Sequence, residues 1–413
     1  MLDIRARSPR ALVLIVVLFS LCSTLAADDD RIRDMDISLI TILPGKALYS
    51  SFGHTCIRIL DNRTGRDILY NYGLSANPFD IKFALGMLQG RMEFLVAAGK
   101  TADVLRFYRE VENRTILEQT LRLDEQQRRA LEAALAHDAL PENRVYNYRY
   151  FSDNCTTRIA VMLDAITGGN GSPAAAEEPK TMRASIAEVL DGRPYLSLAL
   201  GTLFGPLTDK RASGTESIFL PEQLMRWAAQ AENQTSEGSG SLVGATGTLY
   251  EATLAETPAI TATPLAMSVI MVGLAILLVV FRGKPRIMAA LFDALFFSII
   301  AVTGLAIVLF WVFARYQEAA WNINLLWAGV LPIMGLGLSS WKRLGQVSLV
   351  LFRIATISAC VVVFAGGFGL QTIPAELRLL AAATAIRCAA RGRLIPGRLV
   401  SAERRPRSSA PSE

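Results

Sequence analysis

The sequence predicts an exported α+β domain followed by an all-α transmembrane bundle of about four to five helices. The chain of 413 residues is 52% hydrophobic and only 19% charged. Its mean hydropathy of +0.33 is too high for an ordinary soluble protein of this length. Strand and helix patterns mix in the first half of the chain, and long apolar segments fill the second half.

The N-terminus has the pattern of an export signal. Arg5, Arg7 and Arg10 precede an apolar run at 11–22, and the small residues at 24–26 offer a cleavage site. We therefore predict a signal peptide or N-terminal anchor at 1–27. Beyond it, four cysteines remain, and their scattered positions do not form a disulfide framework.

Residues 28–235 are predicted to form the exported, periplasmic domain. Strands are indicated at 36–43 (DISLITIL), 54–60 (HTCIRIL) and 67–73 (DILYNYG). The clearest helix is 124–139, which Asp124 can cap.

Residues 236–263 are rich in Ser, Gly, Thr and Ala, so we predict a flexible linker there. Residues 264–390 should form the transmembrane domain, because a bilayer-spanning helix takes about 20 apolar residues. The predicted spans are 265–281, 289–313, 323–340, 347–370 and 377–390.

Charge around these spans predicts their orientation. Basic residues flank one side at 282–286 and 341–343, and the tail 391–413 is also basic. Because cytoplasmic loops carry the excess of Lys and Arg, the linker end should lie outside. The net charge of +5 is concentrated in this tail. We therefore expect a multi-pass membrane protein whose N-terminal domain is exported, and no nucleic-acid partner.

The candidate site combines His54, one of only two histidines, with Cys155. Asp153 and Asn154 can cap a helix that places Cys155 in its first turn, where backbone N–H groups and the helix dipole favour the thiolate. A histidine within hydrogen-bonding reach would exchange the proton during nucleophilic catalysis.

Simpler interpretations stay open for both residues. Cys155 could be a small core residue or could form a disulfide with Cys56, and His54 could be a strand histidine bonded to a backbone carbonyl. Cys56 faces the same side of its strand as His54 and could line the site or the core. His137 is predicted to lie on a helix surface.

Further residues complete the predicted site. Asn71 is the first choice to orient the imidazole, with Asp67 second, and Asn154 and Tyr150 beside the cysteine are predicted to contact substrate. Asn322 and Asn324, at the outer end of the third span, could bind lipid head groups or cap that helix. Asp293 lies in or near a span, where it is either a functional residue or an interfacial aspartate. We expect no metal and no cofactor.

Several of these stretches resemble one family, the Lnb-type bacterial lipoprotein N-acyltransferases. The matching stretches are SLITILPGKALYSSFGHTCIRI (38–59), LYNYG (69–73), NRVYNYRYFSDNCTTRI (143–159), SIFLPEQL (217–224) and WNINLLWAGVLP (321–332). The resemblance implies a permuted papain-like (NlpC-type) periplasmic domain in which Cys155 is the nucleophile and His54 the general base.

The resemblance also implies a reaction. Cys155 would accept a fatty acyl chain from a phospholipid as a thioester and pass it to the N-terminal amine of a diacylated lipoprotein. Two other functions remain open from the residues alone. One is a papain-like hydrolase of peptidoglycan peptides or phospholipid esters, and the other is a non-catalytic membrane receptor.

Overall fold

Largely buried strands build a sheet from the first part of the chain, and apolar helices build the last part. A computed structural model describes residues 31, 34–75, 80–168, 180–211, 217–236, 238–253, 263–281, 286–314, 316–365 and 369–394. The predicted signal at 1–27 and most of the basic tail lie outside these residues. The chain divides into two compact units, each described by itself below. The first contains residues up to 191 and 210–258, and the second contains 192–209 and the residues from 259 onward.

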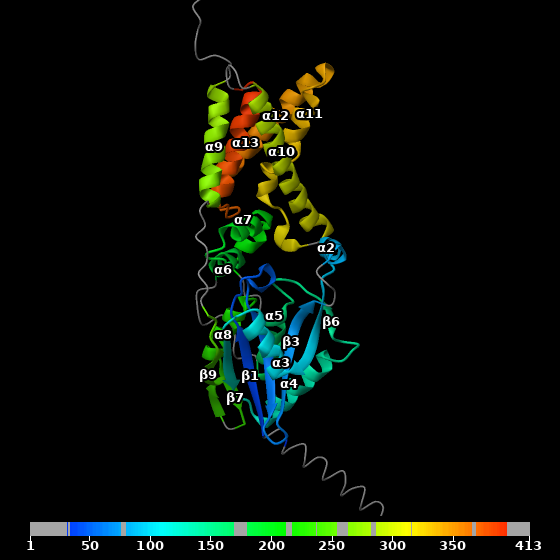
Figure 1. The fold of residues 1–413 in the computed structure, drawn as a ribbon, viewed down its shortest axis with the longest axis vertical. Coiled ribbons are helices and arrows are strands. Elements are labelled where there is room, and N and C mark those ends of the chain that lie inside the picture. The colour runs from blue at the N-terminus through cyan, green and yellow to red at the C-terminus, as the bar shows by residue number, and fades with distance from the viewer. Residues whose placement is uncertain are drawn as a thin grey trace, which may run out of the picture. The chain divides into compact units, whose positions relative to one another are not determined.

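The first unit is centred on a seven-stranded antiparallel sheet with the order β6-β4-β3-β2-β1-β5-β9 (Figure 1). Its strands are β1 (Met35–Ile42), β2 (His54–Asp61), β3 (Arg66–Ser75), β4 (Glu93–Lys100), β5 (Ile116–Leu121), β6 (Val145–Asn147) and β9 (Val243–Tyr250). A separate hairpin pairs β7 (Glu232–Thr235) with β8 (Gly238–Ser241). The three predicted strands are confirmed to within two residues at each end.

Helices cover the sheet on both faces. The main core lies under α4 (Glu125–Asp138), α5 (Cys155–Ile166) and α8 (Pro221–Gln230). The predicted helix at 124–139 is confirmed as α4, and the Asp124 side chain accepts from the Gln127 N–H as its cap. On the other face, α3 (Thr101–Arg106) covers a smaller core that includes Ile40, Cys56 and Tyr108. Among the described residues, this unit also contains the helices α2 (Ile81–Leu88) and α6 (Met182–Val189).

The structure differs from the predicted linker. Residues 238–250 form β8 and β9, and β9 extends the main sheet by pairing with β5. The side chains of β9 are largely exposed. Its stability therefore comes from the backbone ladder, which a composition argument based on burial does not detect. Within the former linker, residues 254–262 lie outside the described structure.

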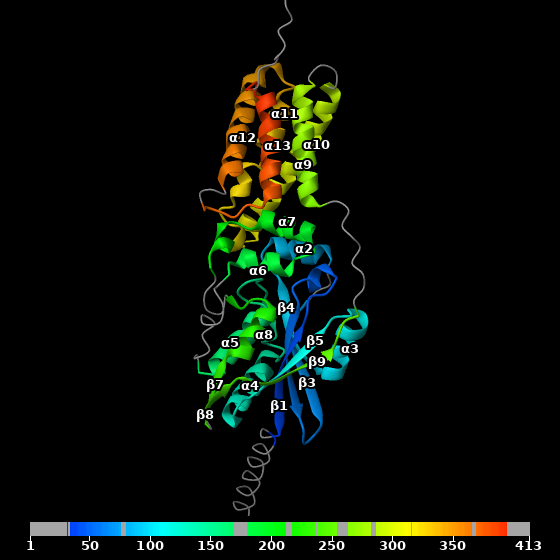
Figure 2. The ribbon, with the colours of Figure 1, turned by 90° about the vertical axis from the view of Figure 1, so that its left-hand side faces the viewer.

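The second unit is helical. It contains α7 (Pro194–Leu203), α9 (Pro264–Val280), α10 (Arg286–Val308), α11 (Leu331–Leu338), α12 (Gly345–Ala365) and α13 (Ala375–Arg391), which Figure 2 shows from a second side. Two of its helices, Ile287–Phe313 and Lys342–Phe364, are long and apolar enough to cross a membrane. Pro264–Val280 and Ile323–Leu338 are apolar but shorter.

Residues 192–209 belong to this second unit, although we predicted them within the periplasmic domain. The apolar helix α7 contacts α9, α10 and α13. The Thr202 carbonyl accepts hydrogen bonds from Asn322 and Asn324, and the Phe204 carbonyl accepts one from Gln371. Buried amides that bind backbone carbonyls explain why this segment stays with the membrane helices.

Candidate active site

His54 is the first residue of β2, directly opposite Ile42 at the end of β1. The preceding Gly53 has φ +80°, and a Cβ there would lie 3.0 Å from the Ile42 carbonyl oxygen. A residue with a side chain would be strained in this turn. The glycine therefore lets the chain enter the strand tightly and places the imidazole at the end of the sheet.

Cys155 is the first residue of α5. Asn154 caps this helix, because its Oδ1 accepts from the N–H groups of Thr156 and Thr157 at 2.8 Å each. The Arg158 N–H bonds the Asn154 carbonyl. Among the described residues, the Cys155 N–H has no acceptor, so it is the donor that remains available at the positive end of the helix.

The structure brings Cys155 and His54 together, so that each side chain changes the pKa of the other. Burial raises the pKa of the Cys155 thiol. The charge and hydrogen bond of His54, the Thr55 N–H and the Thr156 hydroxyl act in the opposite direction, and the net effect lowers the thiol pKa below its ordinary value. Cys56 and Cys155 are both free thiols.

The pKa of the His54 imidazole changes in the opposite direction to that of the thiol. Burial lowers the pKa of His54, whereas the acidic groups of Tyr108, Cys155 and Cys56 raise it when they are ionised, and the net pKa lies well above the ordinary value. Burial raises the pKa of Tyr108, so this phenol is neutral at pH 7 and supplies no negative charge. Ionisation of the Cys155 thiol therefore favours the protonated form of His54.

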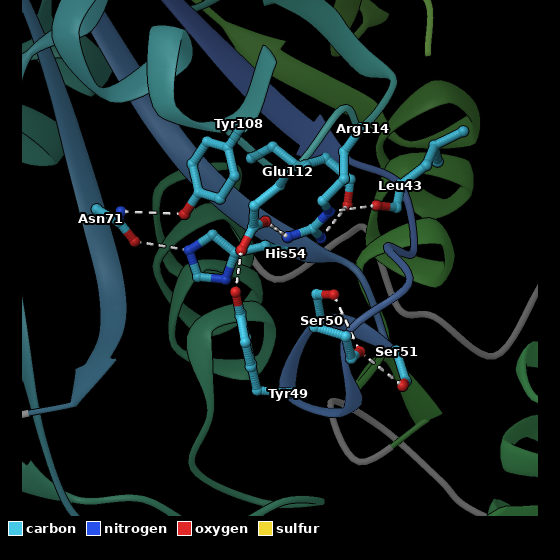
Figure 3. Close-up of polar contacts among 11 residues, drawn as sticks. Leu43, Tyr49, Ser50, Ser51, His54, Asn71, Tyr108, Glu112 and Arg114 are labelled. Atoms are coloured by element: carbon cyan, nitrogen blue, oxygen red, sulfur yellow. Dashed lines mark hydrogen bonds and ion pairs between the residues drawn. The ribbon is translucent and has the colours of Figure 1, made fainter. Parts of the chain in front are cut away.

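Asn71 orients the imidazole, as Figure 3 shows. His54 Nε2 lies 2.6 Å from Asn71 Oδ1, and Asn71 Nδ2 donates to the Tyr108 hydroxyl at 3.3 Å. Since an amide oxygen only accepts, Nε2 carries the hydrogen and the other ring nitrogen is left for Cys155. Asp67, the second choice, is bonded to Arg58 and Thr101 instead.

Tyr108, which no sequence pattern indicated as a site residue, fixes the direction of the Asn71 amide. Its ring centroid lies 5.9 Å from that of His54. Arg114 lies over the Tyr108 ring at 5.4 Å and forms an ion pair with Glu112 at 2.7 Å. Tyr49 donates to the same Glu112 (Figure 3). No local pattern predicts these contacts, because Tyr108 follows Asn71 by 37 positions.

We expect Tyr108→Phe to weaken catalysis without unfolding the unit. The ring would still pack, but Asn71 Nδ2 would lose its acceptor and the amide could turn its NH₂ toward His54. The rate of Cys155 alkylation by iodoacetamide should fall about tenfold, and the pH profile of the rate should change as well. A variant with the wild-type pH profile would show that Tyr108 only packs.

Gly73 lies beside the cysteine in a backbone conformation that favours glycine. It has φ +81°, and a Cβ there would lie 3.6 Å from Cys155 Cβ and 3.7 Å from the Tyr146 hydroxyl. The backbone therefore favours glycine for its conformation, while the neighbouring space permits ordinary contact.

Gly73→Ala should destabilise the first unit by about 1 kcal/mol, because alanine adopts this backbone region at a cost. Thermal unfolding of the purified protein measures this effect. A melting temperature equal to that of the wild type would contradict the strain argument.

The other predicted site residues are divided between the two units. Tyr150 is 44% exposed near Cys155. Asn154 is buried, and its Nδ2 donates to the carbonyls of Tyr150 and Phe219, so its amide is fully used in holding the loop.

Asn322 and Asn324 lie in the second unit and are buried. Asn322 caps the turn at Ile323–Leu326 by accepting from the Asn324 N–H, and Trp327 donates to Asn324. Asp293 is buried in α10 and paired with Arg387 and Arg391 of α13. His137 is exposed on α4, as predicted.

The described residues contain no group of three or more His, Cys, Asp or Glu side chains that could hold a metal ion. The site contains a cysteine–histidine pair with an amide that orients the ring. Such a pair performs nucleophilic attack on a carbonyl carbon and protonation of a leaving group.

Two family models match the chain. The Lnb N-terminal periplasmic domain matches residues 26–186, which include His54, Asn71 and Cys155. The Lnb transmembrane domain matches residues 256–395. Neither the curated proteins nor the solved structures contain a match.

Proposed function

The chain belongs to the Lnb family of lipoprotein biogenesis and is a membrane protein with a periplasmic domain, and from the Cys155–His54 pair we propose its reaction. It transfers a fatty acyl chain from a phospholipid, through a thioester on Cys155, to the N-terminal amine of a diacylated lipoprotein. The observation that carries this proposal is the position of Cys155, at the start of α5, beside an imidazole that Asn71 orients. No cofactor takes part.

In the first step the Cys155 thiolate attacks the carbonyl carbon of the phospholipid ester. The negative charge moves to the carbonyl oxygen, where the Cys155 N–H is one donor for it. When the intermediate collapses, the bond to the glycerol oxygen breaks and His54 gives its proton to that oxygen. A lysophospholipid leaves, and the acyl chain remains as a thioester.

In the second step the α-amine of the lipoprotein attacks the thioester carbonyl. His54 is now neutral and takes the proton from the amine, while the carbon–sulfur bond breaks to give the amide and the thiolate. The thiolate–imidazolium pair of the resting enzyme is thereby restored. A thioester suits this sequence because it is reactive toward amines.

The fold supports the proposal in general form. A helix that starts at the nucleophilic cysteine, packed on an antiparallel sheet whose strand β2 begins with the histidine, suits a permuted papain-like domain. The apolar helices of the second unit suit a multi-pass protein of the inner membrane, whose two substrates are both anchored in lipid.

The experiment that tests this function is the intact mass of the purified protein after incubation with phospholipid vesicles. The wild type should gain the mass of one fatty acyl group, and hydroxylamine should remove it. Cys155→Ala should gain nothing. Adding a diacylated lipopeptide should discharge the adduct and yield an acylated amine.

Other results separate the alternatives. Lipid turnover without transfer to the lipopeptide would indicate a phospholipid hydrolase. The absence of both adduct and lipid turnover in a folded wild type would contradict the proposal and leave peptidoglycan cleavage or a receptor role.

A further inference from the structure

Four large apolar side chains are exposed on two short segments of the first unit. Leu48 and Tyr49 are 69% and 64% exposed on the turn before β2, and Ile81 and Leu85 are 73% and 51% exposed on α2. Ile81 and Leu85 are four residues apart, so they share one face of α2. We call these four residues the apolar rim.

The apolar rim lies at the end of the sheet that carries the catalytic residues. At this end, His54 begins β2 opposite Ile42, and the pair Ser75 and Phe94 joins the end of β3 to the start of β4. The turn with Leu48 and Tyr49 immediately precedes β2, and α2 connects β3 to β4. Figures 1 and 2 both place α2 at this end of the sheet.

A row of aromatic rings leads from α2 to the loop that holds Cys155. The Phe83 and Phe94 centroids are 6.2 Å apart, those of Phe94 and Tyr148 are 4.6 Å apart, and those of Tyr148 and Tyr150 are 5.6 Å apart. The Tyr148 ring also lies next to Gly73, which is beside Cys155. Packed aromatic rings thus connect α2 with the loop that precedes the nucleophile.

The side chains of the apolar rim suit contact with a lipid surface better than exposure to water or contact with a polar protein surface. Lys82 is exposed between Ile81 and Leu85, and Lys46 is exposed beside Leu48. Exposed apolar side chains with neighbouring lysines are typical of segments that lie in the membrane interface. The carboxylate of Asp80 accepts from the N–H groups of Lys82 and Phe83, so these first donors of α2 have a partner.

The chain connects the first unit covalently to the apolar helices of the second unit. Residues 251–263 join β9 to α9, the first apolar helix that follows in the chain, so the first unit is held near a bilayer by its own covalent connection. We propose that the apolar rim contacts the periplasmic leaflet of that bilayer and delivers a phospholipid ester to Cys155. The delivery step rests on the proposed acyl transfer, whereas the contact itself does not.

The contact is tested by photolabelling the full-length Cys155→Ala protein, which needs no activity. The protein is placed in nanodiscs that contain phosphatidylcholine with a diazirine in its acyl chain. After irradiation, adducts should map to peptides with residues 46–50 and 81–88, and not to α4, whose outer face is polar. Adducts confined to the second unit would overturn the proposal.

The consequence for activity is tested with Ile81→Ser/Leu85→Ser. Acylation of Cys155 by phospholipid in nanodiscs should fall at least about tenfold, whereas acylation by a soluble short-chain ester should stay within about twofold. The matched control is Val145→Ser/Val161→Ser, because these side chains are 50% and 52% exposed but lie outside the rim.

The outcomes are distinguishable. Equal loss with both esters would mean that the substitutions damage the site and would contradict a membrane role. A wild type that accepts neither ester would refute the acyl transfer, and the photolabelling would still decide whether the rim meets lipid.

Discussion

His54→Ala is expected to lower the rate of Cys155 acylation by about 10³-fold, within the range for loss of a general acid–base group. Without the imidazolium, burial of Cys155 is no longer opposed by His54, so the pKa of the thiol should rise. At pH 7 the variant would contain little thiolate. The leaving glycerol oxygen would also lack its proton donor.

The pH dependence of alkylation by iodoacetamide measures the same change directly. A thiolate exists above its pKa, so the wild-type Cys155, whose pKa is lowered, should react at pH values below the ordinary thiol pKa of about 8.5. In His54→Ala the midpoint of the profile should move to higher pH. Mass spectrometry of the labelled peptide separates Cys155 from the other cysteines.

The chain supplies a matched control in its other histidine. His137 is exposed on α4, so His137→Ala should retain both the rate and the alkylation profile of the wild type. If His54→Ala kept the wild-type profile, His54 would not set the state of the thiol. The proximity of the two side chains would then have no chemical consequence.

Local patterns in the sequence predicted the parts of this site that depend on local structure. The strand containing His54 and the helix start at Cys155 follow from residues within a few positions of each. Asn71 was predictable because β3 follows β2 directly and antiparallel neighbours pair, and the structure places it opposite Cys56.

Contacts between distant segments were not predictable in this way. Tyr108 reaches Asn71 from a helical turn after α3, and the strand β9 reaches β5 across more than a hundred residues. The segment 192–209 joins the membrane unit through hydrogen bonds to its backbone carbonyls, which its side-chain pattern does not encode. Such pairings depend on the assembled fold, whereas composition and periodicity describe only one segment at a time.

The structure identifies the partners of Asp293, for which the sequence indicated only a position in or near a span. The sequence indicated an ionisable residue in or near a span, and the structure shows Asp293 Oδ1 2.6 Å from Arg387 Nε and Asp293 Oδ2 2.6 Å from Arg391 Nε. Its side chain is fully buried, and that of Arg387 is 4% exposed. The pair joins α10 to α13 inside the helical unit.

We expect Asp293→Ala to destabilise the helical unit by about 3–5 kcal/mol, because Arg387 would remain as a buried charge without its counterion. The melting temperature in detergent or nanodiscs should fall on the order of 10 °C. Glu188→Ala, which removes the exposed ion pair with Lys180 at 2.7 Å, is the matched control and should change the melting temperature little.

Replacing both charges separates the cost of an unpaired charge from the value of the pair. Asp293→Leu/Arg387→Met removes the buried charges together, so it should recover most of the stability that Asp293→Ala loses, with Arg391 turning its partly exposed head to water. If the double variant recovered stability but lost acyl transfer, the pair would be required for function. If Asp293→Ala alone melted like the wild type, Arg387 would have another way to satisfy its charge, and the ion pair would not hold α10 to α13.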